Sequence, residues 1–150
     1  MNLKRVFLGA FVFWLVTNAL GFIVSGYLIH EVVLDSTYQA SEPLWRPELR
    51  QDPPDMASLM PGWLLMSLLS SLVVAGIYSC VSNSFDGPGW KKGMTWGLCL
   101  SLFVTTNYFG LTGVMNLPNK IALWWSIDAI FLFLIAGAVM GWAVGKWADD

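Results

Sequence analysis

Long apolar stretches separated by short polar ones dominate the pattern of this chain. Four stretches of 24 to 30 residues contain a single charged side chain between them, Asp128. A helix needs about 20 residues, at about 1.5 Å each, to cross about 30 Å of hydrocarbon. The pattern therefore predicts an all-α integral membrane protein with four transmembrane helices. These spans cover about residues 6–29, 61–82, 94–115 and 121–144.

The connections between the predicted spans favour an antiparallel bundle in one domain, residues 1–150. The long connection, residues 30–60, is acidic and contains four prolines, which disfavour a continuous helix. The other two connections are short and rich in Gly, Pro and Asn, as expected of turns. The first apolar stretch exceeds the about 7–15 residues of a secretory signal, so we expect it to be retained as a span.

Composition and charge agree with this architecture and orient it. The chain is 56% hydrophobic and 12% charged, whereas a soluble domain carries about 25% charged residues. Five basic residues fall on the side of the two termini and three on the side of the long loop. Because basic residues favour the cytoplasmic side, we expect both termini in the cytoplasm and a loop of about 30 residues outside.

Every predicted span carries a polar side chain between its outer third and the midplane. These side chains are Asn18, Ser67, Ser71, Thr106, Asn107 and Asp128. Asn107 and Asp128 lie symmetrically about the turn at residues 117–118, so we expect them to face each other. The inner halves of the spans are largely apolar, which argues against a continuous water-lined pore.

Two interpretations of this polar cluster stay open. Polar side chains can bind helices together within a membrane, which would give Asn18 and Asn107 a structural role. An intramembrane carboxylate is costly enough that Asp128 also suggests a proton, cation or ligand site.

The last predicted span has a second face, opposite Asp128, formed by Gly137, Gly141 and Gly145. Small residues four apart permit close backbone approach between membrane helices. This face fits either another span of the same chain or a second protein. Gly21 and Ser25 on the first span offer a possible partner within the chain.

The long loop contains His30, Tyr38 and a Leu-Trp-Arg-Pro-Glu run with Trp45, Arg46 and Glu48. This pattern resembles a set of small bacterial four-span membrane proteins of unknown function, over most of the chain. The resemblance implies the same fold and a bacterial inner-membrane location, and it implies no activity. We expect the loop to fold over the outer polar cluster, with Trp45 at the interface and Arg46 paired with a carboxylate.

Motifs of enzymatic chemistry are absent from the sequence. It contains no G-x-S-x-G, H-E-x-x-H or P-loop motif, and its single histidine is His30. His30, Glu31, Asp35 and Glu48 have side chains that suit a divalent metal, but their spacing matches no ligand pattern. We therefore expect no enzyme, cofactor, metal or nucleic-acid partner.

Two hypotheses for function follow. The first is a non-catalytic accessory or assembly subunit in the lipid bilayer, either self-associated or bound in a larger membrane complex. The second is a small transporter, or a ligand- or proton-binding protein, with an outward-facing site built on Asp128, Asn107 and Asn18.

Overall fold

The computed structural model describes residues 2–148, and within this range every regular element is helical. The long helices are α1 (Leu3–Leu20), continued by the π-helix η1 (Gly21–Val33), then α3 (Met56–Val81), α4 (Gly89–Thr112) and α5 (Asn119–Trp147). The short elements are α2 (Asp35–Ala40) and the 3₁₀ turns η2 (Glu42–Leu44), η3 (Pro47–Arg50) and η4 (Ser82–Ser84). The predicted all-α class is confirmed.

Three of the described helices are long and apolar enough to cross a membrane, as expected of an integral membrane protein. They are Leu3–Val33, Met56–Ser84 and Asn119–Trp147. Helix α4 is 24 residues long but is not among them. Its two lysines and the run Thr105–Asn107 make it more polar than the other long helices.

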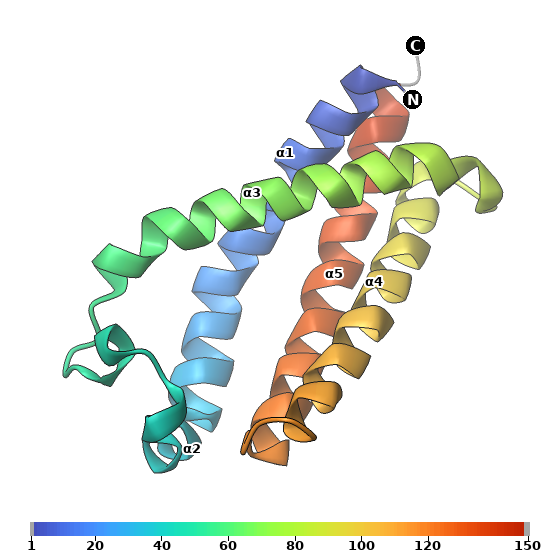
Figure 1. Ribbon diagram of the computed structural model, residues 1–150. Helices are drawn as coiled ribbons and strands as arrows, with labels where there is room; N and C mark the ends of the chain where they lie inside the picture. The colour runs from blue at the N-terminus through green and yellow to red at the C-terminus, as the bar shows by residue number, and fades with distance from the viewer. Residues whose placement is uncertain (1, 149–150) are drawn as a thin grey trace.

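Helices α4 and α5 form an antiparallel hairpin and lie side by side (Figure 1). Glycines on both helices bring the two backbones into direct contact. A Cβ atom added to Gly93 would lie 2.8 Å from Gly141 Cα and well inside contact distance of the Gly137 carbonyl oxygen. One turn further along α4, a Cβ on Gly97 would meet the carbonyl of Phe133 in the same way. Only glycine permits this separation.

Helix α1 packs against both α5 and α3 through a core of small and medium side chains. The core contains Ala10, Phe13, Ala75, Tyr78, Ala136, Met140, Val144 and Ala148. Gly9 lies at the closest approach, because an added Cβ would stand 3.3 Å from both Ala75 Cβ and Val144 Cγ2.

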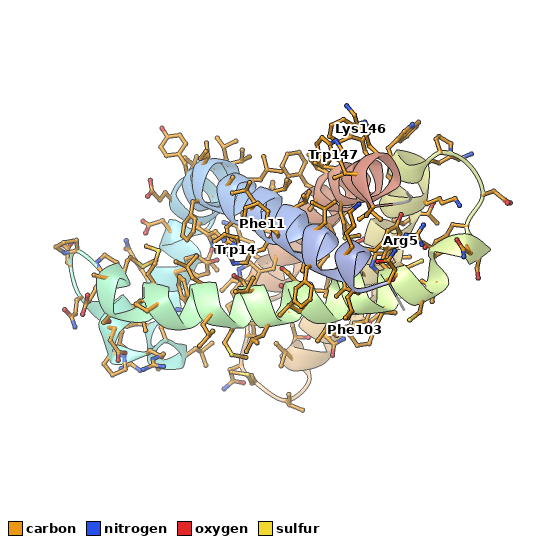
Figure 2. The ribbon with its side chains drawn as sticks, turned by 90° about the horizontal axis from the view of Figure 1, so that it is seen from above. Arg5, Phe11, Trp14, Phe103, Lys146 and Trp147 are labelled. Carbon is orange, nitrogen blue, oxygen red and sulfur yellow. The ribbon has the colours of Figure 1, made fainter. Side chains whose placement is uncertain are left out.

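Helix α3 departs from the expected antiparallel bundle, because it runs across the other long helices instead of along them (Figure 1). Gly9, Ala10 and Ala75 let α1 and α3 approach closely at the crossing. Beyond the crossing, the large side chain of Trp14 lies between the two helices (Figure 2) and donates to Ser67 Oγ at 2.9 Å. Because α1 and α3 touch at the crossing and Trp14 lies between them beside it, the two helices diverge on the side of Trp14.

The segment 34–55, between η1 and α3, folds back over the adjacent ends of η1 and α5. Its first residue, Leu34, is completely buried with Leu117, Ile121 and Ala122 in a second apolar cluster. Lys120 Nζ donates to the Val33 carbonyl at 3.0 Å and so ties the end of η1 to the start of α5. This end of the molecule carries the site described next.

Candidate ligand site around Asp128

The π-helix η1 aligns two polar side chains towards α5. Ser25 and His30 are five residues apart, the spacing that π-helical hydrogen bonds join, and both reach the same site: Ser25 binds Asp128 and His30 lines the cavity beside it. In an α-helix the same two residues would point about 140° apart. The π-helix covers 13 residues.

Asp128 lies on α5 opposite this face of η1 and is 9% exposed. The hydroxyl of Ser25, itself 2% exposed, donates to Asp128 Oδ1 at 2.5 Å. A carboxylate accepts about four hydrogen bonds, so one donor leaves it with unused acceptor capacity. Among the side chains of residues 2–148, Ser25 is the one with a hydrogen bond to Asp128.

Tyr38, from α2, joins the segment 34–55 to the site. Its hydroxyl accepts from Trp125 Nε1 at 2.7 Å and lies 2.6 Å from His30 Nδ1. An indole can only donate, so the Tyr38 oxygen is the acceptor of the bond with Trp125. The imidazole tautomer decides whether Tyr38 or His30 Nδ1 donates the second bond.

The position of Tyr38 also keeps its phenol protonated. Burial raises the pKa of Tyr38 to about 12, while the hydrogen bond from Trp125 acts in the opposite direction. The phenol therefore remains a hydrogen-bond donor across the whole physiological pH range.

Trp45 covers Tyr38 and Trp125 from the side of the segment 34–55. Its Nε1 donates to the Tyr38 carbonyl at 3.0 Å, and its ring centre lies 5.1 Å from that of Tyr38 and 6.2 Å from that of Trp125. Arg50 holds Trp45 in place, because its Nε donates to the Trp45 carbonyl at 2.7 Å. These contacts fix the segment over one end of the site.

A cavity of about 230 Å³ opens beside Asp128, between η1, α4 and α5. Its polar and aromatic lining comes from His30, Tyr108, Trp125 and Asp128, and its apolar lining from Ala129, Leu132 and Phe133. The Tyr108 and Trp125 rings stand edge to face with centres 5.4 Å apart. The cavity thus combines one carboxylate with two electron-rich rings.

The polar residues predicted for one cluster divide into separate groups. Asn18 Nδ2 donates to Ser67 Oγ at 3.2 Å, which links α1 to α3 away from Asp128. Ser71 donates to the Ser67 carbonyl, and Thr106 to the Phe103 carbonyl, each within its own helix.

The expectation that Asn107 faces Asp128 is wrong. Asn107 is exposed and donates to the Phe103 carbonyl of its own helix at 2.8 Å. The two residues are matched in distance from the turn but not in rotation about the helix axis. Tyr108, about 100° further round α4, takes the place beside Trp125 and Asp128.

The other residues of the loop motif stay outside the cavity. Arg46 pairs with Glu48 through two hydrogen bonds of 3.0 and 3.3 Å; the Arg46 side chain is exposed and that of Glu48 partly exposed. This partner lowers the pKa of the Glu48 carboxyl. Within residues 2–148, no group of three or more His, Cys, Asp or Glu side chains comes close enough to hold a metal ion.

The glycine face of α5 has a partner within the chain. Gly137 and Gly141 pack on Gly93, and Gly141 also packs on Gly89. Gly145 lies at the end of the same stripe, about 3.6 Å from where a Cβ on Gly89 would stand. The partner stripe is on α4, not at Gly21 and Ser25 on the first helix.

Three residues of the site escaped the sequence-based prediction: Ser25, Tyr108 and Trp125. The sequence pattern predicts an α-helix over residues 6–29, and in an α-helix Ser25 would point away from His30. The five-residue spacing of Ser25 and His30, repeated by Gly21 and Gly26, is the sequence feature that fits a π-helix. Trp125 lies near the end of a predicted span, where tryptophan is common for reasons of membrane position alone, and no sequence feature singled out Tyr108.

Comparisons with protein-family models, curated proteins and solved structures find no match for this chain.

Proposed function

We propose that the chain is a four-span protein of the bacterial inner membrane, with both termini in the cytoplasm. The three long apolar helices and the distribution of basic residues support this topology. Because α3 runs across the other helices (Figure 1), it would cross the bilayer at a steep tilt, which the 29 residues of Met56–Ser84 are long enough to allow. For α4, support comes from its packing along α5, since a helix paired with a spanning helix shares its environment. On this proposal the lipid bilayer covers the many exposed apolar side chains of α1, η1 and α3.

Within that topology, we propose that the protein binds a small organic cation in the cavity beside Asp128. The observation that carries this proposal is the meeting of Asp128 with the rings of Tyr108 and Trp125 on one cavity wall. Aromatic faces attract cations, most strongly where water is excluded. A bound cation would also compensate a carboxylate inside the membrane.

The size and shape of the cavity restrict this ligand further. A volume of about 230 Å³ is smaller than the about 300–1,000 Å³ of drug-sized sites. The apolar side chains Leu132 and Phe133 favour alkyl substituents on the cation. A quaternary or alkylated ammonium group meets these requirements better than a hydrated metal ion.

The alternative of an accessory or self-associated subunit has less support. It depended largely on the glycine face of α5 being free to meet another protein. Because α4 occupies Gly137 and Gly141, that face offers no surface to a second protein. The absence of catalytic motifs agrees with both hypotheses and does not distinguish them.

The binding proposal is tested with choline and its uncharged isostere 3,3-dimethyl-1-butanol, on protein purified in mild detergent. We expect the wild-type protein to prefer choline by well over about tenfold, because the Asp128 carboxylate adds to the roughly tenfold effect of one desolvated cation–π contact. Asp128→Asn should reduce this preference by at least about tenfold, since only the rings of Tyr108 and Trp125 then remain. The matched change Asp52→Asn, at an exposed residue, should leave the preference intact.

A second variant separates a lost site from a lost fold. Leu132→Phe fills the cavity without touching the Ser25–Asp128 hydrogen bond, so it should reduce choline binding while the helical circular dichroism persists. Equal affinity for choline and its isostere in the wild type would refute the proposal. An Asp128→Asn protein that fails to fold, together with a Leu132→Phe protein that still binds choline, would favour a purely structural role for Asp128.

A further inference from the structure

Asp128 has no lysine or arginine partner among the side chains of residues 2–148. Its hydrogen bond comes from Ser25, whose hydroxyl is neutral. Lys120, Arg46 and Arg50 are the lysine and arginine residues at this end of the molecule, and each donates its hydrogen bonds to another acceptor. Asp128 is only 9% exposed, so water reaches little of its carboxyl group.

Within the described chain, three titratable side chains interact with the charge of Asp128. His30 belongs to η1, Tyr38 to α2 and Tyr108 to α4. The charged residues of α1 lie in its first turn, at the opposite end of the molecule (Figure 1). A phenol loses its proton only near pH 10, and burial raises the pKa of Tyr38 to about 12, so we expect neither tyrosine to be charged at neutral pH. Of these three neighbours, His30 is the one that can carry a positive charge.

A carboxylate alone in this cavity would leave the site with a net negative charge. The remaining lining is aromatic or apolar, and its apolar part comes from Ala129, Leu132 and Phe133. An uncompensated charge in apolar surroundings is costly, and a carboxyl group there takes up a proton instead. Without a ligand, we therefore expect the site to hold one proton, on Asp128 or shared with His30, and to be neutral.

A bound organic cation makes this proton unfavourable. The ligand itself supplies the positive charge that the carboxylate requires. A protonated Asp128 would offer the ligand no negative charge, and a protonated His30 would repel it within a cavity of about 230 Å³. The proton and the organic cation therefore compete for the same carboxylate.

We infer that the cavity exchanges one proton for one organic cation, an inference that rests on the proposed cation site. When the cation binds, the bond from the proton to Asp128 or His30 breaks, the electron pair stays on the side chain, and the proton passes to water. The ligand undergoes no covalent change. By linkage, a low pH weakens cation binding, and a bound cation makes the site release its proton more easily. Intramembrane acids serve as proton sites of this kind in pumps and transporters.

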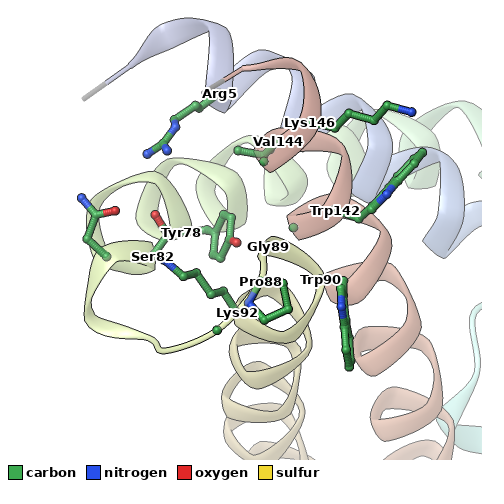
Figure 3. Close-up of a pocket in the computed structure, with 14 residues that line it drawn as sticks. Arg5, Tyr78, Ser82, Pro88, Gly89, Trp90, Lys92, Trp142, Val144 and Lys146 are labelled. Atoms are coloured by element: carbon green, nitrogen blue, oxygen red, sulfur yellow. The ribbon is translucent and has the colours of Figure 1, made fainter. Parts of the chain in front are cut away.

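The larger cavity near the chain termini, of about 400 Å³, lacks the groups for such an exchange (Figure 3). None of its fourteen described lining residues is Asp or Glu, and the basic residues Lys92 and Lys146 are among them. A cation that entered this cavity would displace no carboxyl proton from its described wall. Protons released with the ligand are therefore assigned to the cavity beside Asp128.

The test counts the protons released when choline binds to the full-length wild-type protein in mild detergent. Calorimetric titration at pH 7 in phosphate and in Tris gives this number, because the two buffers take up a proton with very different heats. We expect about one proton per choline, and an affinity that rises by about tenfold per pH unit from pH 5 to pH 7. The uncharged isostere 3,3-dimethyl-1-butanol should bind without releasing a proton.

Two variants that convert a carboxyl group to an amide locate the proton. Asp128→Asn should bind choline more weakly and release no proton at pH 7. Glu31→Gln is the matched control, because Glu31 is exposed and adjacent to His30 in the sequence but does not line the cavity. This variant should release the same number of protons as the wild type.

Three results would overturn the inference. One is a wild-type protein that prefers choline to its isostere but releases no proton, which would leave the cation site standing without the exchange. Another is equal proton release with choline and with the isostere, since the release would then not follow the charge of the ligand. The third is unchanged release from Asp128→Asn. Failure of the cation site itself appears in a different measurement, as equal affinity of the wild type for the two compounds.

Discussion

The two ends of the α4–α5 hairpin are built in opposite ways. At the end near the termini, Gly89, Gly93 and Gly141 bring backbone against backbone, and the contact depends on missing side chains. At the other end, the large side chains of Tyr108 and Trp125 make the contact between the helices and line a cavity beside Asp128. A contact made by backbone alone cannot adapt, whereas one made by side chains can open to admit a ligand.

The largest expected effect comes from adding a methyl group to the backbone contact. Gly93→Ala would push a Cβ into the Gly137 carbonyl, so we expect a loss of about 3 kcal/mol, the upper end of overpacking effects. Gly76→Ala is the matched control, because nothing lies within 4 Å of an added Cβ there. That change should stabilise α3 slightly, by about 0.5–1 kcal/mol.

Unfolding by sodium dodecyl sulfate in mixed micelles, followed by circular dichroism, measures both glycine variants. Equal midpoints for Gly93→Ala and Gly76→Ala would show that the contact between α4 and α5 does not depend on a missing side chain at Gly93.

A smaller loss of stability is expected from a substitution at the end of the hairpin where side chains make the contacts. Tyr38→Phe removes the acceptor of Trp125 Nε1 and the partner of His30 Nδ1, which should cost about 2 kcal/mol. Protease cleavage within the segment 34–55 should accelerate, because Tyr38 joins this segment to α5. Tyr27→Phe, at a residue 60% exposed, should change neither quantity. Unchanged cleavage in Tyr38→Phe would mean that other contacts hold the segment.

The pH dependence of stability tests whether the Tyr38 hydroxyl is buried. Its pKa is raised to about 12 in the folded protein, against about 10 for an ordinary tyrosine. The unfolded chain therefore loses this proton first, and the resulting stabilisation is complete below pH 10 and disappears as the pH rises to about 12. Unfolding of wild type and Tyr38→Phe across pH 9–12 should show a steeper decline in the wild type. Parallel curves would contradict the buried environment of the phenol.

The smallest effect is expected for Arg46 and Glu48, which belong to the same sequence motif as Trp45. Their ion pair is exposed, and exposed pairs contribute little to stability. Arg46→Ala should therefore leave the unfolding midpoint unchanged, whereas Trp45→Ala should lower it because Trp45 packs on Tyr38 and Trp125. An equal loss in both variants would show that the ion pair does more than its exposure suggests.

The helical class, and the presence of helices long and apolar enough to cross a membrane, were predictable because both depend on long apolar stretches that are visible in the sequence. The crossing of α3 was not, since it depends on Gly9 and Ala75 meeting at one point and on Trp14 filling the space beside it. These contacts join residues more than 50 positions apart, and no periodicity in either helix indicates them.

The candidate site was predictable only in part. Asp128 and His30 are conspicuous as the one acid in a long apolar stretch and the single histidine of the sequence, and the structure brings both to one cavity. Ser25 was not predictable as the partner of Asp128, because its position depends on the π-helical turn of η1. Asn107 was misplaced because equal distance from a turn fixes depth but leaves rotation about the helix undetermined.

The most direct test of the proposed cation site is the ratio of choline affinities between the wild-type protein and Asp128→Asn, measured in the same detergent. The carboxylate on the cavity wall, beside Tyr108 and Trp125, predicts a ratio of at least about ten. Equal affinities in two folded proteins would contradict it, and Asp128 would then be a residue that only joins α5 to η1.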